Sequence, residues 1–412
     1  MASSRNKLIF IFITRLIDSI GFGIVMPVLP GLLMDIGHMS LADAARTGGI
    51  LAATYALLQF FFGPFMGNLS DRFGRRPVIL LSLLAYAIDY AVMGFAPTVA
   101  LLFVGRAIAG IAGAVYAPAN AYIADITPPE ERARAFGRIG AAFGVGFILG
   151  PAIGGWLGEY GPRAPFFAAA ALAGANCIFG YFVLPESLPP EQRRPFSLAR
   201  ANPLGTLAAL KRFPMVMALV FAVFLWQTAH NVYPATWSFY GAAKFHWSSA
   251  MIGISLMTTG IGMAIVQFGA TGWVVKKLGE ARAAILGIAI AMFSCVAYAL
   301  IPAGWMVFLI QPIGSLQAVA YPSLTALMSR EVPANEQGEL QGGIAGVTSL
   351  SSIFGPFLMT QTLAEFSAAG APIYFPGAAF ILAACLMCAA LALLVAQLKL
   401  HHPRPVPATE VA

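Results

Sequence analysis

The sequence predicts an all-α integral membrane protein with twelve transmembrane helices in two similar six-helix halves. Three observations support this prediction: an apolar composition, a series of long apolar segments, and an internal repeat. Of the 412 residues, 59% are hydrophobic and only 10% are charged. Soluble domains are typically about 45–50% apolar and about 25% charged. The composition therefore excludes an ordinary soluble protein.

Twelve segments are long and apolar enough to cross a bilayer, which requires about 20 mostly apolar residues. The first follows a short basic N-terminus without a small-residue cleavage site, so we expect a retained span and not a signal peptide. The predicted spans are 8–35, 46–66, 77–96, 99–123, 136–158, 164–184, 214–241, 250–275, 282–301, 304–328, 340–364 and 373–396.

The longest break between spans, 185–213, is rich in proline and charge and separates six spans from six. We therefore expect an N-terminal six-helix bundle over 1–184 and a C-terminal six-helix bundle over 214–396. The break is then a cytoplasmic linker, and residues 397–412 form a cytoplasmic tail.

Basic residues are concentrated in the termini and in alternate loops. Cytoplasmic loops carry an excess of Lys and Arg, so this distribution predicts a multi-pass protein of the cytoplasmic (inner) membrane with both termini in the cytoplasm. The opposite loops hold only Arg46, Arg163 and Lys244, and Arg15 and Arg106 lie within spans. The other 19 of the 24 basic residues are Arg5, Lys7, Arg72, Arg75, Arg76, Arg132, Arg134, Arg138, Arg193, Arg194, Arg200, Lys211, Arg212, Lys276, Lys277, Arg282, Arg330, Lys399 and Arg404.

The two halves resemble each other at a fixed offset of 205 residues. Repeated six-helix halves are typical of transporters whose binding site lies near the midplane, between the repeats. The matching positions are Gly67 and Gly272, Gly74 and Gly279, Tyr116 and Tyr321, Gly137 and Gly342, and Gly150-Pro151 and Gly355-Pro356.

A charged motif, "GNLSDRFGRRPV" from Gly67 to Val78, interrupts the apolar sequence between the second and third spans. Glycine allows two helix ends to approach closely. Asp71 can meet an arginine or a helix N-terminus, and Arg75 can pair with an acid on another helix. The alternative is a solvated, positively charged cytoplasmic loop. The expected gating residues are Gly67, Asp71, Arg72, Gly74, Arg75 and Arg76.

This motif resembles the G-x-L-x-D-R-x-G-R-R/K signature of the major facilitator superfamily. The resemblance implies that its ion pairs latch the cytoplasmic side in the outward-facing state. The second-half echo, "GWVVKKLGEAR", has Lys276 where Asp71 stands.

The fifth span carries "GAAFGVGFILGPAIGG", which resembles the antiporter motif of drug-exporting members of that superfamily. Gly146, Gly150 and Gly154 are spaced by four and so lie on one helix face, and with Pro151 they are the expected residues of this motif. Small residues at this spacing allow close helix contact. An ordinary packing face is the alternative interpretation.

Three further stretches are similar to the tetracycline/proton antiporters, the TCR/Tet subgroup. They read "LIDSIGFGIVMPVLPGLL", "LLSLLAYAIDYAVMGFAP" and "LMSREVPANEQGELQGGIAGVTSLSSIFGP". The sequence departs from that subgroup where its members carry a His in span eight and an Asp in span nine, because Met263 and Ala291 stand there. The proton step of the second half therefore cannot operate here in the same way.

Two carboxylates, Asp18 and Asp89, lie deep within predicted spans. Asp18 lies about 15 Å into its span at 1.5 Å per residue. A central acid costs at least about 2.5 kcal/mol, so it is a functional candidate. Burial disfavours the charged form of a carboxyl group, so we expect both acids to bind and release protons. The resemblance also ties the first acid to proton-coupled export.

Arg106 is the candidate partner of one of these acids. Arg15, three residues before Asp18, shares its helix face. The alternatives are a structural salt bridge for Arg15 and Asp18, and a structural hydrogen-bonded acid for Asp89.

The seventh span contains "WQTAHNVYPATWSFY", in which polar and aromatic side chains recur at roughly helical spacing. Such groups suit an aromatic, hydroxylated ligand, and His230 can also titrate and join the proton-coupling residues. The alternative is interhelical hydrogen bonding plus an interfacial aromatic belt. The substrate-binding candidates are Gln227, His230, Asn231, Trp237, Gln59, Asn120, Gln311 and Gln317.

We therefore expect a proton-coupled antiporter that exports a small amphipathic, tetracycline-like drug by alternating access. The expected partners are this solute, protons and the lipid bilayer, with no nucleic acid, no cofactor beyond the proton gradient, and a monomeric state. No nucleophile–base pair, metal-ligand spacing or nucleotide loop is recognisable, so an enzyme is not expected. An importer or exporter of another metabolite or sugar, and a non-transporting receptor or scaffold, remain open.

Overall fold

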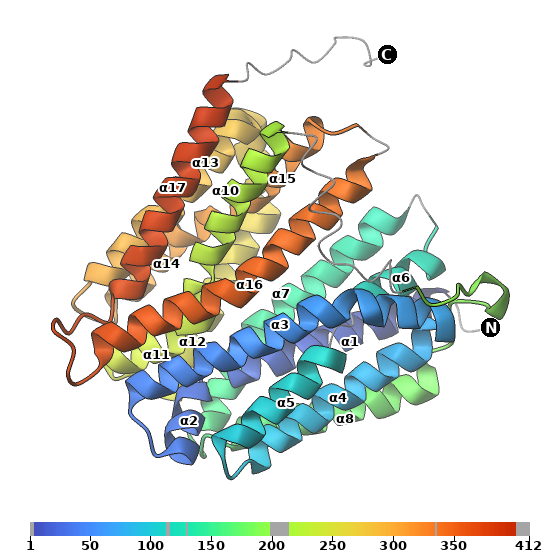
Figure 1. Ribbon diagram of the computed structural model, residues 1–412, viewed down its shortest axis with the longest axis horizontal. Coiled ribbons are helices and arrows are strands. Elements are labelled where there is room, and N and C mark those ends of the chain that lie inside the picture. The colour runs from blue at the N-terminus through green and yellow to red at the C-terminus, as the bar shows by residue number, and fades with distance from the viewer. Residues whose placement is uncertain (1–3, 113–115, 129–130, 198–213, 334–335, 401–412) are drawn as a thin grey trace.

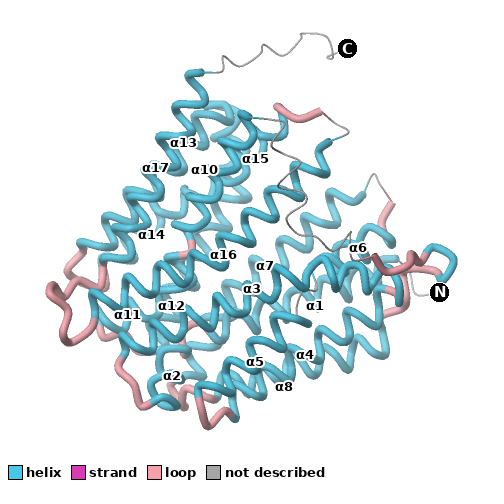
Figure 2. The backbone as a smooth tube through the Cα atoms, in the orientation of Figure 1, coloured by secondary structure: helices cyan, strands magenta, loops and turns pink. Residues whose placement is uncertain are grey.

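The computed structural model describes residues 4–112, 116–128, 131–197, 214–333 and 336–400. These residues form helices and loops and contain no strand (Figure 2). The helices of the first half are α1 (Ser4–Val25), α2 (Leu29–Gly37), α3 (Leu41–Phe73), α4 (Arg75–Phe95), α5 (Val99–Ala112), α6 (Tyr116–Ile126), α7 (Arg132–Gly158) and α8 (Ala164–Val183).

A short 3₁₀ turn, η2 (Pro190–Gln192), lies in the linker, and the second half follows it. Figure 1 shows the blue-to-green helices of the first half in one bundle and α10–α17 in another. The second-half elements are α10 (Pro214–His230), α11 (Val232–Phe245), α12 (Ser249–Ile265), η5 (Val266–Ala270), α13 (Thr271–Leu300), α14 (Met306–Ser315), η6 (Leu316–Val319), α15 (Ala320–Arg330), α16 (Gln337–Ser367) and α17 (Ala378–Leu400).

Within the described residues, nine helices are long and apolar enough to span a membrane, or ten if α1 and α2 form one span bent by 53°. Two features keep this number below twelve. The stretch Ser249–Leu300 runs through two predicted spans as 52 helical residues, with a non-helical break at Gly279. Helix α5 has only 14 residues, and residues 113–115, which separate it from α6, are not described. Twelve spans and the two domain boundaries therefore stay predictions, and residues 198–213 of the linker and 401–412 of the tail lie outside the described part.

The two halves contact each other at one end of the molecule. There Gly49 of α3 lies against Thr360 of α16, and a Cβ on Gly155 of α7 would lie 3.1 Å from the Cα of Gly253 on α12. Arg46 Nη2 also lies 3.0 Å from a carboxylate oxygen of Glu365.

Towards the opposite end, a cavity of 680 Å³ separates α7 from the second half. Phe268, on the second-half wall of this cavity, is 76% exposed. The protein is therefore closed on the side of Arg46 and open on the side of the α3–α4 turn.

One face of helix α7, formed by Gly146, Gly150 and Gly154, packs closely against α1. A Cβ on Gly146 would lie 2.8 Å from the carbonyl oxygen of Leu16, and one on Gly150 would lie 2.8 Å from the Cα of Gly23. A Cβ on Gly154 would overlap the backbone of Ile24. The predicted close contact is thus confirmed, and its partner is α1.

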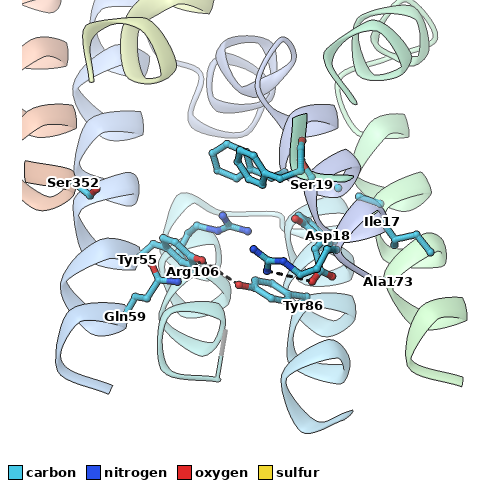
Figure 3. Close-up of a pocket in the computed structure, with 15 residues that line it drawn as sticks. Ile17, Asp18, Ser19, Tyr55, Gln59, Tyr86, Arg106, Ala173 and Ser352 are labelled. Carbon is cyan, nitrogen blue, oxygen red and sulfur yellow. Dashed lines mark hydrogen bonds and ion pairs between the residues drawn. The ribbon is translucent and has the colours of Figure 1, made fainter. Parts of the chain in front are cut away.

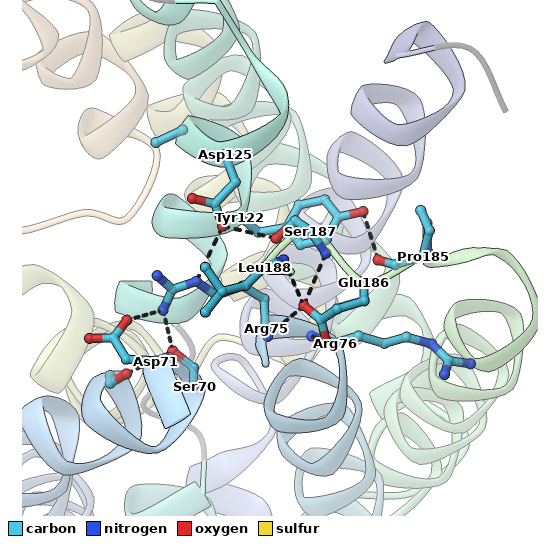
Figure 4. Close-up of polar contacts among 12 residues, drawn as sticks. Ser70, Asp71, Arg75, Arg76, Tyr122, Asp125, Pro185, Glu186, Ser187 and Leu188 are labelled. Atoms are coloured by element: carbon cyan, nitrogen blue, oxygen red, sulfur yellow. Dashed lines mark hydrogen bonds and ion pairs between the residues drawn. The ribbon is translucent and has the colours of Figure 1, made fainter. Parts of the chain in front are cut away.

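The α3–α4 turn contains the charged motif. Gly74 ends α3 with a φ of 105°, a conformation that favours glycine, and its N–H donates to Ser70 O at 3.1 Å. Arg75 Nη1 donates to Asp71 Oδ1 at 2.6 Å, and Arg75 Nε donates to Asp125 Oδ2 on α6 at 3.3 Å (Figure 4). The predicted pairing of Arg75 with an acid on another helix is present.

The linker is attached to this turn through Glu186. Its carboxylate accepts backbone N–H groups of Arg75 at 2.8 Å, Arg76 at 3.3 Å, Ser187 at 2.9 Å and Leu188 at 3.1 Å (Figure 4). A Cβ at Gly74 would collide with that carboxylate. Position 74 therefore requires glycine for two reasons: its positive φ and the nearby Glu186 carboxylate. The sequence did not indicate the second reason.

The second half repeats the turn with its charges reversed. Gly279, 205 residues after Gly74, also has a positive φ, of 75°. In the same register Glu280 stands for Arg75 and Arg330 for Asp125, and these two side chains form an ion pair of 2.7 Å. Each half therefore ties its turn to a neighbouring helix, with opposite polarity.

We predict that Glu186→Ala destabilises the protein. The substitution removes the carboxylate that accepts the first amides of α4, and losing such a cap typically costs about 0.5–2 kcal/mol. Thermal unfolding of detergent-purified protein should show a lower Tm. Glu191→Ala, at an exposed acid of the same linker, is the matched control, and an unchanged Tm for Glu186→Ala would contradict the role given to Glu186.

Candidate functional site

Asp18 lies in a cavity of 330 Å³ that is lined by polar side chains from four helices of the first half and by Ser352 of the second half. Asp18 comes from α1, Tyr55 and Gln59 from α3, Tyr86 from α4 and Arg106 from α5. Figure 3 shows these side chains pointing into one space, with Ser352 of α16 on its far side. We name this the Asp18 cavity.

The Asp18 carboxylate has weak ionic compensation. Among the described residues its ion pair is with Arg15, whose Nη1 lies 4.0 Å away, at the limit for such a contact. The Asp18 side chain retains 15% exposure. A carboxyl group that is weakly paired and reachable from a cavity can exchange protons with little rearrangement.

Hydroxyl groups link the walls of the Asp18 cavity. The Tyr55 and Tyr86 hydroxyl oxygens are 3.2 Å apart, and Gln59 Nε2 donates to Tyr55 at 3.1 Å. The guanidinium carbon of Arg106 lies 5.6 Å from the centre of the Tyr55 ring and 6.0 Å from that of Tyr90. Polar groups of α3 and α4 and the cation on α5 therefore surround the same cavity as the acid on α1.

Asp89 has a different environment, because it is paired with Arg106. Both Arg106 Nε and Nη2 donate to its two carboxylate oxygens, and the Asp89 side chain has no exposed surface. A Cβ at Gly105 would lie only 2.8 Å from Asp89 Oδ1, so the glycine leaves room for the pair. Of the two acids expected as partners of Arg106, the one that pairs with it is therefore Asp89.

A second cavity of 280 Å³ adjoins the first and extends to the second half. It shares Tyr55, Gln59 and Arg106 with the Asp18 cavity and adds Asn231 and Pro356. Asn231 lies between α10 and α11, and its Nδ2 donates to Gln227 O at 2.8 Å and to Ser351 O at 3.3 Å.

A third cavity, of 680 Å³, lies between α7 and the second half, and we name it the Trp226 cavity. It is lined by His230 and Gln317 among the predicted substrate-binding residues, and by Met263. Phe143 lines both this cavity and the Asp18 cavity. The side chain that replaces the family histidine thus faces a cavity, whereas Ala291 is fully buried in the core.

The remaining predicted substrate-binding residues line none of these three cavities. Trp237 is 3% exposed and donates to Ser255 Oγ at 2.9 Å. Gln311 is 4% exposed and bonds to Thr258 and Ser255. For these two residues the geometry fits the alternative interpretation, interhelical hydrogen bonding.

Gln227 is half-buried on α10, and Asn120 is exposed on α6. The eight predicted residues therefore do not form one site. Gln59 and Asn231 line the first two cavities, and His230 and Gln317 line the Trp226 cavity. The other four line none of the three cavities.

Sequence reasoning missed the three tyrosines of the Asp18 cavity. Their spacing was visible, because Tyr55 precedes Gln59 by four residues, and Tyr86 and Tyr90 flank Asp89 by three and one. Residues three or four apart share a helix face, which would have placed Tyr55 beside Gln59.

Comparison with known proteins gives a consistent result. The family model for the Major Facilitator Superfamily matches residues 11–356 and 232–411. The class C tetracycline resistance protein of Escherichia coli is 45% identical over 361 residues, which cover 88% of this chain and 90% of the relative. The class G protein of Vibrio anguillarum is 38% identical over 86% of this chain and 90% of its own length.

Among solved structures, the nucleoside transporter NupG aligns with a TM-score of 0.77 at 13% identity, covering 97% of this chain and 100% of that one. This likeness shows the fold alone. Together with the apolar helices, the matches show a multi-pass membrane protein of a transporter family. The chain belongs to the major facilitator superfamily, in the subgroup of the tetracycline resistance proteins.

Proposed function

We propose that this protein exports a small amphipathic drug of the tetracycline type in exchange for protons, by alternating access. The relatives named as tetracycline resistance proteins, at up to 45% identity, support the substrate class. The observation that carries the coupling is the contrast between the two buried acids: Asp89 is closed off by Arg106, whereas Asp18 faces a cavity with only a distant cation.

The protein is a multi-pass protein of the cytoplasmic (inner) membrane with both termini in the cytoplasm and acts as a monomer surrounded by lipid. The distribution of basic residues supports this orientation. The open side, which carries the α3–α4 turn, then faces the cytoplasm. The described conformation is the one in which an exporter accepts its substrate.

Coupling follows from competition between substrate and proton. From the open side, substrate entering the cavities favours loss of the proton from Asp18. After the halves rock, the outer side opens, the substrate leaves and Asp18 takes up a proton from outside. A protonated, uncharged Asp18 returns through the apolar interior at lower cost than a charged one.

The charged turns limit this motion. The resemblance to other superfamily members implies that the motif of the α3–α4 turn latches the cytoplasmic side when it closes. In the open conformation the ion pairs of Asp71, Arg75 and Asp125 lie within the first half. They keep the turn rigid until the second half approaches.

The direct test uses inverted membrane vesicles with an imposed proton gradient, acid inside. Adding tetracycline should release protons from the vesicles, and a pH-sensitive dye reports the release. No response in vesicles containing folded protein would rule out tetracycline as the substrate. Counterflow assays with sugars and other metabolites would then separate the remaining transport functions.

We predict that Asp18→Asn abolishes pH-driven tetracycline uptake into such vesicles. The amide cannot exchange a proton, but it matches the carboxyl group in size, so folding should be retained. Asp35→Asn is the matched control, because Asp35 is an exposed acid in the same half that pairs with Arg163 at 3.6 Å. Uptake by Asp18→Asn at the wild-type rate would contradict the coupling role of Asp18.

We predict a different outcome for Asp89→Asn. Removing one member of a buried ion pair leaves an uncompensated charge and typically costs about 3–5 kcal/mol. The yield of folded protein and its Tm should therefore fall. The double variant Asp89→Asn/Arg106→Gln should recover much of the loss, as measured by fluorescence-detected size-exclusion chromatography. Equal stability of the single and double variants would show that the pair is not a structural unit.

A further inference from the structure

The Asp18 cavity is lined by an acid and a cation that do not pair with each other. Arg106 lines this cavity with 17% of its side chain exposed, yet its Nε and Nη2 both donate to Asp89. Asp18 pairs with Arg15 at 4.0 Å. An arginine side chain is long and always charged, and an opposite charge that reaches a carboxyl group favours its ionised form. Asp18 can therefore hold a proton only if Arg106 is kept away from it.

The Arg106 guanidinium lies over two tyrosine rings that come from different helices. Its central carbon is 5.6 Å from the centre of the Tyr55 ring on α3 and 6.0 Å from that of the Tyr90 ring on α4. Figure 3 shows Arg106 beside Tyr55. A guanidinium within about 6 Å of a ring centre is attracted to the ring face, and more strongly where water is excluded. Both rings therefore favour the position in which Arg106 meets Asp89.

Neighbouring side chains hold these two rings in place. The Tyr55 hydroxyl accepts a hydrogen bond from Gln59 Nε2 at 3.1 Å and lies 3.2 Å from the Tyr86 hydroxyl. The Tyr90 ring is 7% exposed and stacks on that of Tyr86, with 6.4 Å between the ring centres and 21° between the planes. Tyr86 thus contacts both of the rings that contact Arg106.

Tyr90 also contacts the helix that carries Asp18. A Cβ added at Gly21 of α1 would lie 3.3 Å from the Tyr90 hydroxyl oxygen. Gly21 follows Asp18 by three residues, so the two share a face of α1. One tyrosine therefore contacts both the cation and the helix of the acid, and a smaller side chain at position 90 would leave space between them.

The other ionisable groups around Asp18 do not account for its charge in the same way. Arg15 is on the same helix as Asp18 and stays near it in every conformation, so the cation whose approach can vary is Arg106. In the described part of the chain, the ionisable side chains that line the cavity with Asp18 are Arg15, Tyr55, Tyr86, Tyr90 and Arg106. Helices α7, α8 and α16 contribute Phe143, Ala169, Ala173 and Ser352, none of which titrates.

From these contacts we propose that Tyr55 and Tyr90 form an aromatic clamp, a pair of positioning residues that holds Arg106 on Asp89 and so leaves the exchangeable proton to Asp18. The proposal rests on the proton-coupled export proposed above and specifies how its two acids are kept distinct. Without the clamp, Arg106 approaches Asp18, which then loses its proton at lower pH. Asp89 is left buried without its partner and neutralises itself by binding a proton. The proton then resides on a carboxyl group that has no exposed surface.

The test follows the protonation of Asp18 in the purified full-length protein by infrared difference spectroscopy across a pH titration. The carboxylic acid C=O band that is missing in Asp18→Asn reports this group. Tyr90→Leu removes the ring and should lower the pH at which Asp18 is half protonated by about one unit or more, which is a tenfold loss of proton affinity. Tyr90→Phe retains the ring and should titrate as the wild type does. Tyr55→Leu removes the other ring and should shift the titration in the same direction, so the clamp is testable even if Tyr90→Leu does not fold.

A further background separates the clamp from a general effect of Tyr90 on packing. In Asp89→Asn/Arg106→Gln no guanidinium can approach from α5, so adding Tyr90→Leu there should leave the titration of Asp18 unchanged. An equal shift with and without Arg106 would overturn the clamp, and so would wild-type titrations of both Tyr90→Leu and Tyr55→Leu. If Asp18 titrates and shifts as predicted but vesicles containing the wild type take up no tetracycline, the proposed function is refuted and the clamp stands.

Discussion

The cost of charge in an apolar medium is the constraint on which this structure depends. The first half places two acids and two arginines, Arg15 and Arg106, in the interior of a bundle of apolar helices. Each charge must be paired, or must be able to neutralise itself, because an isolated buried ion is expensive. Asp89 meets this demand by its pair with Arg106. Asp18 does so only weakly, which leaves protonation as its means of neutralisation.

Close backbone contacts determine how the halves can move around these acids. Glycines of α7 bring it against α1 within the first half, and Gly155 brings the end of the same helix against α12 of the second half. Contacts without bulky side chains can act as pivots, since few interdigitated groups must separate when helices tilt. Beyond this pivot the glycine-lined stretch of α7 forms a wall of the open cavity. The same helix therefore packs against α1, contacts the second half and lines the open cavity.

The sequence was sufficient for the fold class, the superfamily and the contacts that follow from helical periodicity. Spacing by four predicted the face formed by Gly146, Gly150 and Gly154, and the motif predicted an ion pair between Arg75 and a second helix. Contacts across distant segments could not be read in this way: Glu186 reaches the α4 N-terminus over more than 100 residues. Similarly, polar residues of the predicted seventh span diverge, because Trp237 lies in the second-half core while His230 faces a cavity. Helical spacing fixes which residues share a face but not what that face meets.

The central claim is that Asp18 holds the proton that substrate displaces. The most direct measurement is the number of protons released when tetracycline binds to the detergent-purified protein in weakly buffered solution, followed with a pH indicator. The account predicts release on binding to the wild type, and binding without release in Asp18→Asn. Release of the same size from both proteins would contradict it and would place the exchangeable proton on another group.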